Sequence, residues 1–260
     1  MLNSVLSIAR NAGKMITDAT GLHVEKKPGH ANFVTNMDKA VQAYLEKALC
    51  ELVPGSRFIG EEKDCEGLTN EPTWIVDPVD GTTNLIHDFR HSAVSIALTQ
   101  NGAPVIGVIY QPYVDEMFYA EKCKGAYLNG TPIHVSDMPY GDALVAFGSS
   151  PYDPALARAG IRICCQYLLE CADVRRTGSC AIDLCNLACG RVDLFFELQL
   201  SPWDVAAGAL IVEEAGGVFR MPLRDDGVKF EGKNAVFASN AVCADHALKV
   251  FFDTLRSDAQ

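Results

Sequence analysis

Hydrophobic and polar positions follow two different patterns along the chain. Residues 2–17 and 37–51 repeat apolar side chains with helical spacing, which predicts two amphipathic helices. "SRFIG" and "TWIVD" are short apolar runs that end at acidic residues and predict strands. From residue 92 to 128 the pattern favours β-structure, with hairpin turns expected at Asn101-Gly102 and Asn129-Gly130.

After about residue 142, strand-like and helix-like segments alternate. The pattern predicts strands at "ALVAFGS", "VDLFFEL" and "AVFASN", and helices at residues 154–170, 179–189, 203–214 and 242–254. We therefore expect one α/β (α+β) unit over 1–260, in which layered sheets are covered by helices. Its approximate halves are an antiparallel-sheet half, 1–140, and an alternating α/β half, 141–260.

Composition restricts the function classes. The chain has 260 residues, 48% of them hydrophobic, and a net charge of −11. This charge argues against general binding of nucleic acid or anionic membrane, but a bound divalent cation can reverse it locally for a small phosphorylated substrate. The N-terminus has the pattern of an amphipathic helix and no apolar run is long enough to span a bilayer. With ten cysteines, we expect reduced thiols and a cytoplasmic location.

The stretch "TWIVDPVDGTTNLIH" carries Asp77 and Asp80, three residues apart around Pro78. Pro and Asp-Gly are common turn residues, and an aspartate there often accepts hydrogen bonds from nearby amides. The second interpretation is a metal site built by the two carboxylates. The segment alone does not decide between them.

Three further carboxylates favour the metal. Glu61 ends a strand-like run, and Asp38 and Asp204 each lie in the first turn of a predicted helix. Alone, Asp38 and Asp204 are each also explained by favourable interaction with a helix N-terminus. Together with Asp77 and Asp80 they occupy strand ends and helix starts, where α/β folds assemble sites. Oxygen ligands without His or Cys suit Mg²⁺, and paired metals are a common device for hydrolysing phosphate esters.

The turn after Asp77 fits this chemistry. Pro78 fixes the local backbone, so that Val79 can present its carbonyl to a metal. Gly81, Thr82 and Thr83 are expected to open a short helix whose free amides can hold a phosphate.

Four segments give the chain a wider resemblance. "WIVDPVDGTTN" and "WDVAAGALIVEEAGG" match the two signature motifs of the inositol monophosphatase family, a member of the lithium-sensitive, Mg²⁺-dependent sugar-phosphatase superfamily. "VTNMD" and "FIGEE" match its two shorter acidic segments in the same order, and the resemblance spans about residues 5 to 250. It implies the layered αβαβα sandwich of that superfamily.

The resemblance also implies roles for individual residues. A first Mg²⁺ would be held by Glu61, Asp77 and the Val79 carbonyl, and a second by Asp77, Asp80 and Asp204. A third, weaker Mg²⁺ would depend on Glu61, so that two to three ions are expected. The remaining roles are water activation by Thr82 with Asp38, phosphate binding by the amides of Gly81 and Thr82, and sugar binding by Gly178, Ser179, Glu197 and, with less support, Ser149.

Glu197 can also be judged from its own position. It ends a strand-like run seven residues before Asp204 and so could reach the same cavity, where a carboxylate can accept hydrogen bonds from neighbouring hydroxyls. The alternative is a solvated strand end. Arg175 and Arg176 could meet a phosphate or form a solvated pair. His87 and His91 have helical spacing but lack a third zinc ligand in the sequence.

The resemblance implies a phosphomonoesterase for myo-inositol monophosphate and similar small polyol phosphates, inhibited by lithium and homodimeric. One alternative is a different substrate: fructose 1,6-bisphosphate, histidinol phosphate, a nucleotide 3′-phosphate or NADP(H). The other is a regulatory protein that keeps the fold and binds RNA or a protein. Leu85 and Arg90 depart from the family pattern just after the catalytic turn and bear on substrate preference. Residues 63–72 form a polar loop after Glu61 that could act as a lid.

Overall fold

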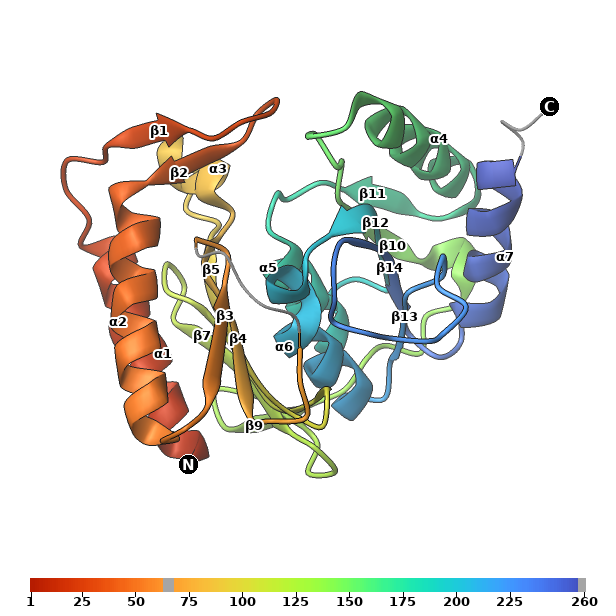
Figure 1. Cartoon of the computed structure of the whole chain (residues 1–260). Helices are drawn as coiled ribbons and strands as arrows, with labels where there is room; N and C mark the ends of the chain where they lie inside the picture. Colours follow the sequence, from red (N-terminus) through yellow and green to blue (C-terminus); the bar gives the residue numbers. More distant parts are fainter. Residues whose placement is uncertain (63–67, 257–260) are drawn as a thin grey trace.

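The chain folds into five layers, in the order helix, sheet, helix, sheet, helix (Figure 1). This computed structural model describes residues 1–62 and 68–256, so the polar loop expected at 63–72 lies partly outside the described residues. The layered αβαβα sandwich implied by the sequence motifs is confirmed. No helix in the described ranges is both long and apolar enough to cross a bilayer.

The predicted helices are all present, with ends shifted by a residue or two. They are α1 (Leu2–Thr17), α2 (Asn36–Leu52), α3 (Thr82–Ile86), α4 (Pro154–Glu170), α5 (Cys180–Ala188), α6 (Pro202–Glu214) and α7 (Ala244–Arg256). α1 and α2 pack on the outer face of the larger sheet, α5 and α6 lie between the two sheets, and α4 and α7 cover the smaller sheet (Figure 1).

The larger sheet has seven strands in the order of the chain. They are β3 (Arg57–Gly60), β4 (Thr73–Asp80), β5 (Ala93–Gln100), β6 (Ala103–Gln111), β7 (Glu116–Glu121), β8 (Ala126–Leu128) and β9 (Thr131–Ile133). Neighbours are antiparallel except β3 and β4. Both predicted hairpin turns are confirmed, because Asn101, Gly102, Asn129 and Gly130 all have positive φ, as two-residue hairpin turns require.

The smaller sheet has five strands in the order β11-β10-β12-β14-β13. They are β10 (Leu144–Phe147), β11 (Asp173–Arg175), β12 (Leu194–Leu200), β13 (Val218–Arg220) and β14 (Asn234–Ser239). β10 runs parallel to both β11 and β12, so the residues that follow β10 and β11 emerge at the same end of the strands. A separate hairpin, β1 (Val24–Lys26) with β2 (Phe33–Thr35), was not predicted, nor were β11 and β13, because three residues are too few for a clear pattern.

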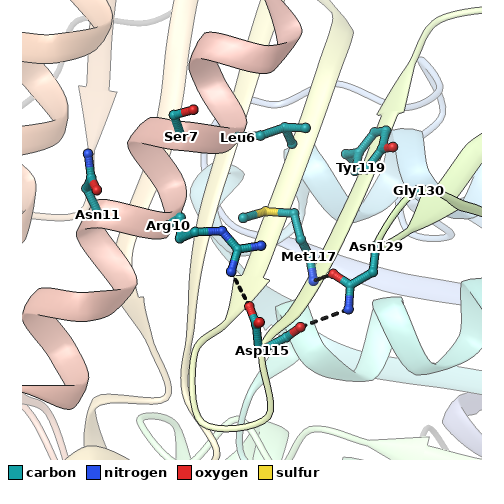
Figure 2. A pocket seen from close by; sticks show the side chains of 9 residues that line it. All are labelled: Leu6, Ser7, Arg10, Asn11, Asp115, Met117, Tyr119, Asn129 and Gly130. Carbon is teal, nitrogen blue, oxygen red and sulfur yellow. Dashed lines mark hydrogen bonds and ion pairs between the residues drawn. The ribbon is translucent and has the colours of Figure 1, made fainter.

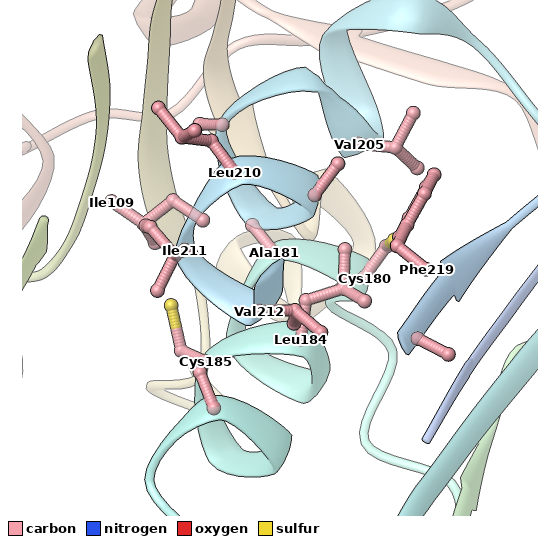
Figure 3. Packing of buried hydrophobic residues seen from close by; sticks show 14 of the residues in the cluster. Ile109, Cys180, Ala181, Leu184, Cys185, Val205, Leu210, Ile211, Val212 and Phe219 are labelled. Atoms are coloured by element: carbon pink, nitrogen blue, oxygen red, sulfur yellow. The ribbon is translucent and has the colours of Figure 1, made fainter. Parts of the chain in front are cut away.

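The middle layer fixes where the site forms. α6 is apolar on nearly every side and is buried between the sheets, in the cluster of Figure 3. Two glycines allow this close approach: a Cβ at Gly107 of β6 would lie 2.7 Å from the Ala207 carbonyl, and one at Gly208 would lie 2.5 Å from Leu184 of α5. The buried position of α6 fixes its N-terminal turn, and with it Asp204, next to the end of β4.

Candidate active site

A cavity of about 700 Å³ lies where β4, the β1–β2 hairpin, α5, β12 and α6 converge. Most of the predicted site residues line it: Glu61, Asp77, Asp80, Gly81, Thr82, Gly178, Ser179, Glu197 and Asp204. Asp38, Val79 and Ser149 are not among the lining residues. Asp38 and Ser149 are instead connected to the cavity wall by hydrogen bonds to Thr82 and Arg176.

Three carboxylates of the cavity form a compact group. One oxygen each of Asp77, Asp80 and Asp204 can be chosen so that all three lie within 4.8 Å of one another. It is the only group of three or more His, Cys, Asp or Glu side chains with this spacing in the described residues, so His87 and His91 have no zinc site there. An all-oxygen donor set of this density fits a hard divalent cation.

Local backbone geometry holds each carboxylate by one oxygen. The register of β4 shifts between Asp77 and Asp80, and the Val79 amide donates to Asp77 Oδ1 at 2.9 Å. The Ser201 amide donates to Asp204 Oδ2 at 2.6 Å, as part of the capping box that starts α6. In both cases the turn interpretation and the metal interpretation are compatible, since one oxygen serves the backbone and the other remains available to a ligand.

Asp80 joins the two halves of the fold. Its Oδ2 accepts a hydrogen bond from the Ser179 hydroxyl and another, of 2.9 Å, from the Ala181 amide, both at the start of α5. Ser179 was predicted as a sugar ligand. In the structure it caps α5, accepting from the Ile182 amide at 3.3 Å, and binds Asp80. Asp80 therefore orients α5 as well as contributing to the acidic group.

The acidic group is electrostatically unfavourable without a cation. Burial, followed by the charges of Glu61 and Asp80, raises the pKa of both Asp77 and Asp204 well above the usual range. Burial also raises the pKa of Asp80 to about 6, although the hydrogen bonds from Ser179 and Ala181 oppose the rise. No ion pair among residues 1–62 and 68–256 involves these three aspartates.

Glu61 differs from the three aspartates because it has a cation partner. Lys27, which follows β1 directly, places its Nζ 3.2 Å from Glu61 Oε1 and 2.5 Å from Glu62 Oε1. Burial nevertheless raises the pKa of Glu61 to about 7. Lys27 carries no signal in the sequence, because it lies in a short hairpin whose approach to "FIGEE" depends on tertiary structure.

Asp38 and Thr82 are connected directly. Thr82 Oγ1 donates to Asp38 Oδ1 at 2.9 Å and lies 3.2 Å from the Val79 carbonyl oxygen. The other Asp38 oxygen, Oδ2, accepts from the Thr35 amide at 2.8 Å in the capping box of α2. The helix-start interpretation of Asp38 and its link to Thr82 therefore both hold. Asp38 is fully buried, so its orientation is fixed from both sides.

Gly81 makes the turn into α3. It has φ of 89°, in the left-handed region, and a Cβ there would lie 3.0 Å from the His91 carbonyl oxygen and 3.4 Å from that of Gly178. A side chain is therefore excluded by both conformation and space. Gly81 thus lets the first turn of α3 reach the cavity wall beside Gly178.

The other polar group of the cavity is centred on Glu197 of β12, which is 9% exposed. Ser150, not the predicted Ser149, supports Glu197: its amide and hydroxyl lie 2.8 and 3.3 Å from Glu197 Oε1. A Cβ at Gly148 would lie 1.8 Å from Glu197 Oε2, so the carboxylate rests directly on that glycine. The expectation of a cavity-lining Glu197, rather than a solvated strand end, is supported.

The structure separates the two arginines. Arg175 forms an exposed ion pair with Asp173, 2.5 Å apart, within β11. Arg176 lines the cavity and donates from Nη2 to the Ser149 hydroxyl at 3.2 Å. Neighbouring side chains of a strand point to opposite faces, which would have separated Arg175 from Arg176. The three-residue β11 was too short to be recognised as a strand in the sequence, so this rule could not be used.

A second cavity, of about 450 Å³, lies between α1 and β7 (Figure 2). Its charged side chains are Arg10 and Asp115, which form an ion pair with each other. Asn129 bridges the nearby backbone, donating to the Asp115 carbonyl at 2.8 Å and accepting from the Met117 amide at 2.9 Å. With its charges already paired, this cavity lacks the unbalanced acidic group of the first one.

Known proteins resemble this chain over most of its length. Inositol monophosphatase 3 of Solanum lycopersicum is 41% identical over 258 residues, which is 95% of each chain. Nus factor SuhB of Escherichia coli is 41% identical over 223 residues, 84% of each chain. The solved structure of a Thermotoga maritima IMPase superposes with a TM-score of 0.87 at 29% identity, covering 98% of each chain.

The sequence profile described as the inositol monophosphatase family matches residues 1–252. That match covers nearly all of the chain, includes every carboxylate of the cavity and agrees with the five-layer fold. The protein is therefore an enzyme of the phosphatase type and belongs to the inositol monophosphatase family.

Proposed function

We propose that the protein is a Mg²⁺-dependent phosphomonoesterase that hydrolyses myo-inositol monophosphate and similar small polyol phosphates. The observation that carries this proposal is the group formed by Asp77, Asp80 and Asp204, which lies in one cavity with Glu197. The acidic group suits a cation and a phosphate, and Glu197 suits hydroxyl groups. The family supports a phosphatase, and the substrate class is our inference.

The acidic group fits Mg²⁺ by donor type, spacing and charge. Asp77, Asp80 and Asp204 would hold the metal, and Glu61 and the Val79 carbonyl would complete the donor set, for two to three ions in all. Bound Mg²⁺ would stabilise negative charge on the phosphate and make a nearby water molecule easier to deprotonate. By the same family resemblance we expect lithium to inhibit by competing for this donor set.

Thr82 and Asp38 would prepare the attacking water. The Thr82 hydroxyl, fixed by Asp38 at 2.9 Å, can accept a hydrogen bond from water while passing its own proton toward the carboxylate. The water oxygen forms the new bond to phosphorus, the ester P–O bond breaks, and the proton that the water gives up balances the one that the alcohol oxygen gains as it leaves. Because water attacks phosphorus directly, no phosphoenzyme is needed. The amides of Gly81 and Thr82 would hold the phosphate.

The test is phosphate release by the purified protein from a panel of esters. The panel contains inositol 1-phosphate, glycerol 2-phosphate, fructose 1,6-bisphosphate, histidinol phosphate, adenosine 3′,5′-bisphosphate and NADP, each with Mg²⁺, with EDTA and with added Li⁺. We expect turnover that requires Mg²⁺, falls with Li⁺ and is fastest with the polyol monophosphates. Faster turnover of a bisphosphate or of NADP would replace the proposed substrate.

Asp80→Asn is the inactive control, and its folding must be checked because Asp80 also caps α5. Asp226→Asn is the matched surface control, since Asp226 pairs with Arg224 and Lys229 away from the cavity. Mg²⁺-dependent turnover lost only in Asp80→Asn would support the metal assignment. No turnover of any ester by folded, Mg²⁺-bound protein would contradict the proposal.

A binding role is the second candidate, because one relative that is 41% identical is named a Nus factor. The net charge of −11 opposes binding to RNA. Titration of a structured RNA at low and physiological salt, with wild-type protein and Asp80→Asn, measures such a role independently of catalysis. We also propose a homodimer in the cytoplasm, for which light scattering on the purified protein tests the subunit number.

A further inference from the structure

Arg176 is a basic side chain in the wall of the acidic cavity. Its guanidinium group borders the cavity next to the buried Glu197 and Asp183. Burial raises the pKa of Glu197 to about 7, and the Ser150 hydrogen bond and the Arg176 charge both oppose that rise. Arg176 is thus close enough to interact with a carboxylate that lines the cavity, and neither the metal site nor water activation requires it.

Two contacts position the Arg176 head group. Nη2 donates to the Ser149 hydroxyl at 3.2 Å, and Nη1 lies 2.5 Å from the place that a Gly178 side chain would occupy. Gly178 also has φ of 90°, so a side chain there is disfavoured twice. The guanidinium therefore rests on one glycine, as the Glu197 carboxylate rests on Gly148.

The guanidinium keeps hydrogen-bonding capacity for a ligand. An arginine side chain has five N–H donors and no acceptor. Within residues 1–62 and 68–256, Ser149 is the one recorded hydrogen-bond partner of its side chain. The ionised carboxylate of Glu197, in the same cavity, offers acceptors and no donor. A donor group and an acceptor group that line one cavity match a polyol, in which each hydroxyl both donates and accepts.

We propose that Arg176 is a specificity-determining residue that donates hydrogen bonds to hydroxyl oxygens of the substrate's non-phosphorylated part. Together with Glu197, which lines the same cavity, it selects a neutral polyhydroxylated alcohol. Two buried carboxylates, Glu197 and Asp183, lie within reach of its charge, so a second phosphate would meet repulsion there as well as attraction. This inference rests on the proposed phosphatase function and assigns its alcohol specificity.

The first experiment compares two substrates in Arg176→Ala, Arg176→Lys and wild type. Inositol 1-phosphate carries hydroxyls beside the ester, and p-nitrophenyl phosphate carries none. Losing a charge-assisted hydrogen bond should raise the KM for inositol 1-phosphate about tenfold in Arg176→Ala while kcat changes little. The KM for p-nitrophenyl phosphate should stay within about twofold, because that substrate never used the bond. Arg176→Lys should restore part of the difference.

Arg175→Ala is the matched control, since it removes the neighbouring arginine from an ion pair outside the cavity. It should leave both KM values unchanged. Equal losses on both substrates in Arg176→Ala would place Arg176 at the phosphate and overturn the proposal. Unchanged kinetics with both substrates would also overturn it. So would a loss of activity seen only when fructose 1,6-bisphosphate is added to the comparison as a third substrate.

A binding measurement separates this inference from the proposed function. Calorimetry on the Mg²⁺-loaded protein gives Kd values for myo-inositol and for inorganic phosphate, the two products, which undergo no turnover. Arg176→Ala should weaken the first about tenfold and leave the second unchanged. If wild type hydrolyses nothing, the phosphatase proposal fails, but this selective weakening still supports the role of Arg176. Equal weakening of both ligands, or of neither, would overturn it.

Discussion

The carboxylates of the cavity differ in whether the protein itself balances their charge. Asp77, Asp80 and Asp204 face one another and form no ion pair with any described residue. Glu197, which is 9% exposed, has the Ser150 amide at 2.8 Å and the Arg176 charge nearby. The first group is completed only by something outside the chain, whereas the second is balanced by the chain itself.

This difference separates the chemistry from the recognition. An unbalanced acidic group costs stability in the free protein and gains it back when a cation binds, so it serves as a metal site. A balanced donor and acceptor pair attracts no strong ion and can recognise a neutral alcohol.

Asp77→Asn should reduce turnover by at least about a thousandfold, because an amide is a poor ligand for a metal on which catalysis depends. The same change should raise the melting temperature of the protein in EDTA, since it removes a carboxyl whose ionisation is opposed by burial and by the charges of Glu61 and Asp80. Phosphate release and thermal melts measure the two effects. A lower melting temperature in EDTA would contradict the idea of an unbalanced group.

Thr82→Ala should lower kcat about a hundredfold, the usual loss when a general-base arrangement is removed. Thr82→Ser keeps the hydroxyl and its 2.9 Å bond to Asp38, so it should retain most of the activity. KM should change little in both variants, because the hydroxyl acts on water and not on the alcohol. Equal activity of the alanine and serine variants would remove Thr82 from the mechanism.

Gly148→Ala should raise the KM for inositol 1-phosphate about tenfold, because the new methyl group would displace the Glu197 carboxylate from its place. p-Nitrophenyl phosphate should be affected less. Gly160→Ala in α4 is the matched control: its Cβ would meet no atom closer than 3.9 Å. Steady-state kinetics on both variants decide this, and an unchanged KM in Gly148→Ala would show that Glu197 does not bind the alcohol.

The smallest effect concerns pH and stability. Burial raises the pKa of Glu61 to about 7 and that of Asp80 to about 6, so the folded, metal-free protein holds protons that the unfolded chain has already lost. Stability in EDTA should therefore fall as pH rises from about 4 to about 7. Saturating Mg²⁺ should reduce this fall, because the metal replaces the protons. Thermal melts at several pH values test this, and stability that rises with pH in EDTA would contradict it.

Local sequence was sufficient for most elements of the fold. The helices α1, α2 and α4 follow from their apolar spacing, and the β5–β6 hairpin follows from Asn101-Gly102. The strands β1, β2, β11 and β13 were missed, because three residues are too few for a clear hydrophobic pattern. The family motifs then supplied the αβαβα order, which local patterns alone did not fix.

The same division applies to the site. The sequence by itself determined which carboxylates end strands and start helices, because capping and turn preferences are local. It could not show that Lys27 reaches Glu61, that Ser150 and not Ser149 supports Glu197, or that Arg176 turns into the cavity while Arg175 turns away. Lys27 and Glu61 are 34 residues apart and Ser150 and Glu197 are 47 apart, so only tertiary packing brings each pair together. The charges were thus specified locally, but which of them are balanced was decided by the tertiary structure.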